Sequence, residues 1–218
     1  MSEINQQEQN NSAVFFKNNQ KQITTFLVVL VLSLGAYYGY ELLYQKPRET
    51  KAADAMFAAE NYFFQDSSKL VLNGDGTNKG VLYIIKNFSG TKAANLAKYY
   101  AGVSYFKTGD FNKSIEYLKD FSTDASQIQA IAYGTLGDAY SELKKNTEAL
   151  DYYKKAAEHT PEDEIISAEY LFRAAQLQEV LGKNDEAVAI YKDIKAKYPK
   201  TEIGLNIDKF IFKLKVQP

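Results

Sequence analysis

Few residues in this chain are of the types that carry out chemistry, and their spacing favours structural roles. The single histidine, His159, lies near the C-terminal end of a predicted helix, where the helix dipole favours a donor or a positive charge. The acidic residues 162–164 fall at the start of the next predicted helix, where negative charge is favourable. Residues 73–76, Asn-Gly-Asp-Gly, lack the remaining ligands of a calcium loop. We therefore predict no catalytic residue, no metal site and no cofactor, and a protein that is not an enzyme.

The composition favours a folded, helical protein. Apolar residues make up 45% of 218, whereas glycine, at 12, and proline, at 4, are both scarce. The 26 basic and 27 acidic side chains nearly cancel, so we expect no attraction to nucleic acid. Absence of cysteine removes disulfides and thiol chemistry and identifies no compartment. The predicted fold class is all-α.

The N-terminal part of the chain reads as a membrane anchor. Residues 1–22 begin with a polar stretch without apolar periodicity, which predicts a disordered or juxtamembrane tail. Residues 23–44 are apolar almost throughout, and a helix of that length spans a hydrocarbon core of roughly 30 Å. Four tyrosines gather at the end of this run, where rings with a polar tip prefer the headgroup zone: Tyr37, Tyr38, Tyr40 and Tyr44. We predict a transmembrane helix at 23–44.

The apolar run has two other interpretations. A cleaved signal peptide would use residues 33–35, Ser-Leu-Gly, as its cleavage site, but the apolar run continues beyond them. A buried core helix would need later segments apolar enough to enclose it, and none is. Lys17 and Lys21 precede the run while Lys46, Arg48 and Lys51 follow it, so basic residues leave the orientation open.

The rest of the chain contains helical repeats. The tetratricopeptide pattern places Trp, Leu, Gly and Tyr on a first helix and Ala and Phe on a second, and ends at Pro. Residues 130–163 match this pattern, with Tyr in place of both Trp and Phe. The first helix has Tyr133, Leu136, Gly137 and Tyr140, the second has Ala149 and Tyr153, and the repeat ends at Pro161. Gly137 and Ala149 leave room for two helices to approach closely, and larger side chains fill the space around them. This predicts one tetratricopeptide repeat.

The same pattern recurs on either side. We predict further repeats at 95–128 and 168–201, preceded at 45–94 by a linker and a divergent helical hairpin. Residues 202–218 have the spacing of an amphipathic helix that would cap the apolar end of the stack. The predicted architecture is a single transmembrane helix followed by an α-solenoid with a C-terminal capping helix.

First helices of such repeats line a concave groove that suits a protein segment. From the register, the predicted protein-binding residues are Tyr99, Val103, Phe106, Asp138, Phe172, Arg173 and Gln176. Some tetratricopeptide domains bind the C-terminal carboxylate of cytosolic heat-shock chaperones through basic and Asn residues at fixed positions. Those positions hold Tyr99, Val103, Thr135, Glu169 and Arg173, and only Arg173 could serve.

Nearly the whole chain resembles the YfgM-like family, ancillary subunits of the SecYEG translocon. The resemblance rests on the short polar N-terminus, the single span and the motifs at 80–82, 91–97, 136–138 and 198–201. It implies an inner-membrane protein with a cytoplasmic N-terminus and periplasmic repeats, whose partners are translocon subunits, envelope chaperones or unfolded client segments. The expected function is an adaptor that assists translocation or periplasmic chaperoning, without a small-molecule substrate. The alternative is a structural scaffold for another membrane or envelope complex.

Overall fold

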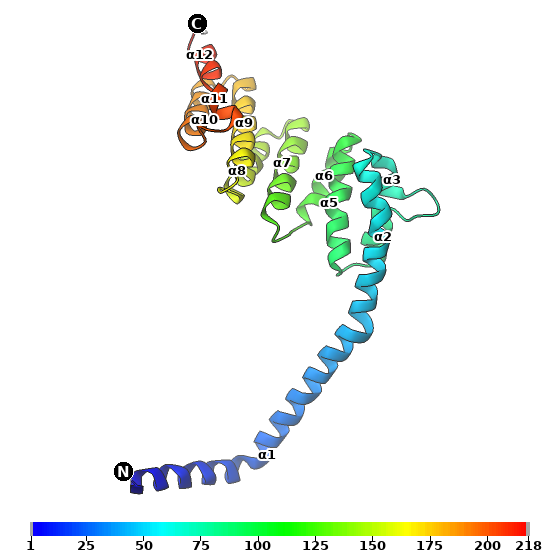
Figure 1. Ribbon diagram of the computed structural model, residues 1–218, viewed down its shortest axis with the longest axis vertical. Helices are drawn as coiled ribbons and strands as arrows, with labels where there is room; N and C mark the ends of the chain where they lie inside the picture. Colours follow the sequence, from blue (N-terminus) through cyan, green and yellow to red (C-terminus); the bar gives the residue numbers. More distant parts are fainter. Residues whose placement is uncertain (1, 217–218) are drawn as a thin grey trace. The chain divides into compact units, whose positions relative to one another are not determined.

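The computed structural model describes the backbone of residues 2–216, and the side chains of residue 14 and of residues 17–214. The chain divides into two compact units, Met1–Thr50 and Lys51–Pro218. Among the described residues the elements are α-helices, with one π-helical turn (Figure 1). The predicted all-α class is therefore confirmed.

The first unit contains α1 (Ser2–Tyr40) and the π-helical turn η1 (Glu41–Gln45). The disordered tail expected within residues 1–22 is instead helical from Ser2, while Met1 lies outside the described residues. No proline or glycine interrupts the chain before Gly35, so the ladder of helical hydrogen bonds continues through the polar residues. A polar sequence lacks a face to bury, but it does not by itself stop a helix.

The apolar part of this helix is uncovered. Side chains from Phe26 to Leu34 are largely exposed, and the segment is long and apolar enough to cross a membrane by length and composition. None of this apolar window is buried within the molecule, which argues against the core-helix interpretation. At its end, the rings of Tyr40 and Tyr44 lie 5.3 Å apart, and Arg48 donates to the Tyr44 hydroxyl at 3.1 Å.

The linker expected to begin at residue 45 is helical, because α2 runs over Lys46–Phe64 and includes Pro47. Proline lacks the amide donor and its ring crowds the carbonyl four residues earlier, which here is that of Leu43. The wider turn η1 lies immediately before it, and a π-turn shifts the hydrogen-bond register by one residue. This local widening explains how the helix continues through Pro47.

The second unit begins with a divergent helical segment. Helices α3 (Ser68–Asn73) and α4 (Val81–Asn87) follow α2, so three helices occupy the place of the predicted hairpin. A short loop follows α3 and is closed by a bridge between Gly74 and Lys79. Asp75 stabilises it by accepting hydrogen bonds from the Tyr62 hydroxyl at 2.7 Å and the Asn78 backbone N–H at 2.7 Å.

Three antiparallel hairpins follow along the chain (Figure 1). Their first helices are α5 (Lys92–Lys107), α7 (Ser126–Glu142) and α9 (Glu164–Val180), and their second helices are α6 (Phe111–Lys119), α8 (Asn146–His159) and α10 (Asn184–Lys197). Each hairpin turn places one residue in the left-handed region: Gly109 at φ 82°, Lys144 at φ 59° and Gly182 at φ 72°. Glycine adopts this conformation without strain, whereas Lys144 does not.

Close helix contacts in these hairpins depend on small residues. A Cβ atom at Gly137 would lie 2.6 Å from the Tyr153 ring, and one at Gly102 would meet Leu118. Ala149 is fully buried and Tyr153 is 5% exposed, so the predicted packing of the second repeat is confirmed. Both glycines therefore set the distance between the first and second helices.

The C-terminal cap differs in detail from the single helix expected at 202–218. It consists of α11 (Glu202–Asn206) and α12 (Asp208–Val216), and residues 217–218 lie outside the described chain. Ile207, at the break, is fully buried, and Ile211 and Leu214 pack into the same cluster as Tyr191. The two short helices therefore bury apolar side chains against the last hairpin.

Candidate protein-binding surface

The seven predicted groove residues lie on the first helices α5, α7 and α9, as the repeat register requires. Their side chains are half-buried, apart from Gln176, which is exposed. Asp138 and Arg173 are directly joined, whereas the three aromatic residues pack in different places along the stack.

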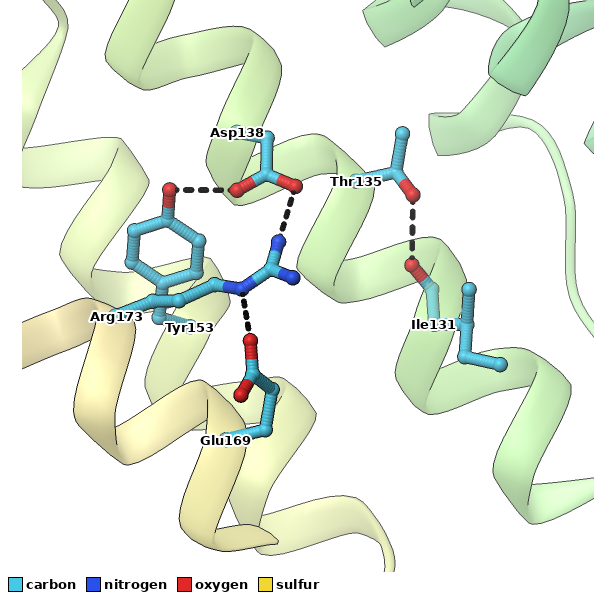
Figure 2. A network of polar contacts seen from close by, with 6 residues as sticks. All are labelled: Ile131, Thr135, Asp138, Tyr153, Glu169 and Arg173. Carbon is cyan, nitrogen blue, oxygen red and sulfur yellow. Dashed lines mark hydrogen bonds and ion pairs between the residues drawn. The ribbon is translucent and has the colours of Figure 1, made fainter. Parts of the chain in front are cut away.

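Asp138 and Arg173 form the centre of a polar network between two repeats (Figure 2). Arg173 Nη1 lies 2.6 Å from Asp138 Oδ2, and Arg173 Nε donates to Glu169 Oε1 at 2.8 Å. The Tyr153 hydroxyl donates to the other Asp138 oxygen at 2.8 Å. Both oxygens of Asp138 are therefore used within the protein, and α7, α8 and α9 are tied together at one point.

The network perturbs the titration of its members. Burial raises the pKa of Tyr153, and the negative charge of Asp138, which accepts its hydrogen bond, raises the pKa further. Burial opposes the charge of Arg173, but the carboxylates of Asp138 and Glu169 outweigh burial, so its pKa lies above the usual value. A neutral tyrosine and a charged guanidinium are thus both favoured beside Asp138.

Tyr170 extends this network into the contact between α7 and α9. Its ring is 6% exposed and lies below the Arg173 guanidinium, whose central carbon is 5.4 Å from the ring centroid. A Cβ atom at Gly134 would overlap the Tyr170 ring, so only glycine leaves room for it. Burial raises the pKa of Tyr170 to about 12. Gly134 and Tyr170 therefore set the spacing between successive repeats.

The predicted aromatic residues make intramolecular contacts. Tyr99 lies 5.4 Å from the Phe121 ring, and Phe106 lies 5.6 Å from the Phe111 ring. Phe172 packs against Phe210 at 4.8 Å and also contacts Tyr191, so part of its ring covers the junction with the cap. These rings offer a partner only their uncovered edges.

Val103 and Gln176 complete the predicted set. Val103 is half-buried on α5, and Gln176 is exposed on α9. Gln176 is therefore the most accessible of the seven predicted positions. Binding at any of the seven stays a prediction.

Sequence reasoning assigned Tyr153 to packing and missed its hydrogen bond to Asp138. Glu169 was considered only as a residue that could not bind the C-terminal carboxylate of a chaperone. Its four-residue spacing from Arg173 on one helix nevertheless favours the observed ion pair. Since Arg173 is bound to two carboxylates, a carboxylate ligand would have to compete with them.

Side chains of the types that bind metals or carry out catalysis do not cluster in the described part of the structure. Among the described residues, no group of three or more His, Asp or Glu side chains could hold a metal ion. The His159 ring lies perpendicular to that of Tyr133, at 5.5 Å between centroids. Its position at the end of α8 agrees with a structural role.

Family models identify the repeats. One model described as tetratricopeptide repeat matches residues 130–163, and a second with the same description matches residues 96–125 and 169–201. No curated protein matches the chain. Repeats of this kind are typically non-catalytic modules for binding other proteins. The three matches, which coincide with the three helical hairpins, support a tetratricopeptide repeat protein.

Proposed function

We propose that the chain is a membrane-anchored adaptor that binds protein segments along the first helices of its repeats. The observation that carries the proposal is the combination of three tetratricopeptide hairpins with one uncovered apolar helix in the same chain. Half-exposed aromatic and polar side chains on α5, α7 and α9 supply both apolar area and hydrogen-bonding groups.

The proposed setting is the inner membrane, near the Sec translocon, with the N-terminus in the cytoplasm and the repeats in the periplasm. Its support is the resemblance of the span and repeat motifs to the YfgM-like family. There the adaptor would bind translocon subunits, envelope chaperones or unfolded client segments. Confinement to the membrane would raise its effective concentration near other membrane-bound partners.

A photoreactive residue at Gln176 tests this proposal in native membranes. Gln176 is exposed on α9, whereas Phe172 is partly covered by Tyr191 and Phe210. A matched probe at Lys154, exposed on the second helix α8, controls for non-specific capture. Adducts identified by mass spectrometry at Gln176 and absent at Lys154 are expected to contain translocon subunits, envelope chaperones or many secreted chains.

Other adduct patterns would contradict parts of the proposal. A single dominant membrane or envelope partner would favour the structural scaffold over an adaptor for many clients. A single cytosolic partner would overturn both the orientation and the translocation setting. Equal, weak labelling at Gln176 and Lys154 would refute binding along the first helices.

A further inference from the structure

A groove lies beside the N-terminal end of α9 and adjoins the Asp138–Arg173 network, because Glu169 and Tyr170 line it. It has a volume of about 950 Å³ and is lined by residues from the start of α7, the loop before α9, the first turns of α9 and the start of the cap. Volumes of this size accommodate several side chains of a ligand.

The apolar part of the groove centres on Ile165. This side chain is 74% exposed, although it lies in the first turn of α9, two residues after the helix cap at Asp163. Ile166, Tyr170 and Ile203 also line the groove and are buried or half-buried. An exposed isoleucine beside other apolar side chains gains free energy when a partner covers it.

The rim of the groove is acidic. Asp163 caps α9 by accepting from the Ile166 amide at 3.1 Å, and it also accepts from Gln127 at 2.7 Å. Glu169 is paired with Arg173. Both carboxylates therefore have partners inside the protein.

Three further carboxylates have no such partner. Among the described residues, Glu162, Glu164 and Glu202 are exposed and form no ion pair. Asp163 and Thr201 already cap the two helices that begin here, so these glutamates are not needed as caps. Lys200 is the one basic side chain that lines the groove, which leaves an excess of negative charge around Ile165.

We propose that this groove docks a short protein segment in which an apolar side chain is flanked by lysine or arginine. The apolar side chain would cover Ile165 and contact Tyr170, while the flanking cations would pair with Glu162, Glu164 and Glu202. Charge complementarity of this kind sets the register of a segment and discriminates against acidic ones. The inference rests on the proposed adaptor function and specifies one class of segment that it binds.

Fluorescence anisotropy with the full chain in detergent tests the inference. The probe is a labelled peptide with one leucine between pairs of lysines, and the matched peptide has glutamates in place of the lysines. The lysine peptide is expected to bind, and the glutamate peptide to bind at least tenfold more weakly at low salt. The difference should shrink as salt is raised.

Two variants separate the apolar and charged contributions. Ile165→Ser is expected to weaken binding of the lysine peptide about tenfold, at both low and high salt. The triple variant Glu162→Gln, Glu164→Gln, Glu202→Gln is expected to weaken it about tenfold at low salt only.

Matched control variants lie outside the groove. Val180→Ser changes an 81% exposed side chain at the other end of α9 and should leave binding unchanged. Three exposed glutamates on the second helices provide a control with the same change in net charge: Glu116→Gln, Glu148→Gln and Glu186→Gln. Equal losses in the control and groove triples would overturn the inference, because the effect would then be one of net charge.

Other results would overturn the inference about the groove without overturning the proposed adaptor function. Equal binding of the lysine and glutamate peptides, or no effect of Ile165→Ser, would overturn the assigned occupant while leaving adaptor binding to the crosslinking test at Gln176. Self-association of the chain that Ile165→Ser abolishes, without binding of either peptide, would overturn it in favour of a second copy as the occupant.

Discussion

The hydroxyl of Tyr153 is expected to stabilise the fold through its hydrogen bond to Asp138, which Tyr153→Phe removes. The ring is 5% exposed and packs against Gly137, so phenylalanine retains the apolar contact. Hydrogen bonds to charged groups contribute about 1.5–3 kcal/mol. Since the Asp138 side chain is 23% exposed and water can replace part of the bond, the expected loss is about 1.5 kcal/mol.

Equilibrium urea unfolding of the full chain in detergent, followed by near-ultraviolet circular dichroism of the tyrosines, measures this loss. Tyr152→Phe is the matched control on the same helix. The Tyr152 ring stacks on that of Tyr140 at 5.4 Å, and its hydroxyl makes no hydrogen bond within the described residues. The control should cost less than about 0.5 kcal/mol.

A double-mutant cycle with Asp138→Ala isolates the interaction itself. The expected coupling energy between Tyr153 and Asp138 is about 1 kcal/mol, because the two groups are in direct contact. If Tyr153→Phe costs no more than Tyr152→Phe, or if the two changes in the cycle are additive, the hydrogen bond does not stabilise the fold and the reasoning is refuted.

Four further substitutions test the backbone and the repeat contacts, each by the same unfolding assay. Lys144→Gly should stabilise the fold by about 0.5–1 kcal/mol, because glycine adopts the left-handed conformation of this residue without strain. Gly182→Ala, at the matching turn, should destabilise the fold by about 1 kcal/mol for the same reason. Changes of the opposite sign would contradict this account. Gly134→Ala should cost about 2 kcal/mol, since overlap with the buried Tyr170 ring outweighs the gain in helix propensity, and a stabilised variant would show that the contact relaxes freely. Burial holds the Tyr170 pKa at about 12, above the unfolded value of 10.0, so its contribution to stability is present below pH 10 and is lost as pH rises towards 12. Tyr170→Phe should therefore make the decline in unfolding free energy above pH 10 shallower, by up to about 1.4 kcal/mol per pH unit, and an unchanged slope would contradict the assignment.

The repeat hairpins were predictable because their signals are local and steric. Gly137, Ala149 and Tyr153 have a fixed spacing that only one helix–helix contact satisfies, and the structure places them in that contact. The N-terminal helix boundaries were not predictable in the same way. A disordered tail was expected before Ile23 and a linker from residue 45, yet a solvated helix needs no apolar face and a π-turn accommodates Pro47.

The candidate surface was predictable in position but not in pairing. Register places Asp138 and Arg173 on α7 and α9, but nothing local shows that residues 35 positions apart meet at 2.6 Å. That distance depends on the spacing between repeats, which Gly134 and Tyr170 set together. Similarly, the acidic residues 162–164 suggested a helix cap, and only the structure shows that Asp163 provides the cap while its neighbours remain unpaired.

The internal pairing of Asp138 and Arg173 would constrain how the proposed surface recognises a partner. A ligand that used either charge would first break a network in which both Asp138 oxygens and two Arg173 nitrogens are already bound, and would leave the buried Tyr153 hydroxyl without its acceptor. Such a ligand would gain little net free energy from these residues, so their effect on affinity should come mainly through the spacing of α7 and α9. Unpaired charge lies instead at the N-terminal end of α9, beside the exposed Ile165. Selectivity between segments should therefore depend on that end of the surface, whereas the centre maintains its shape.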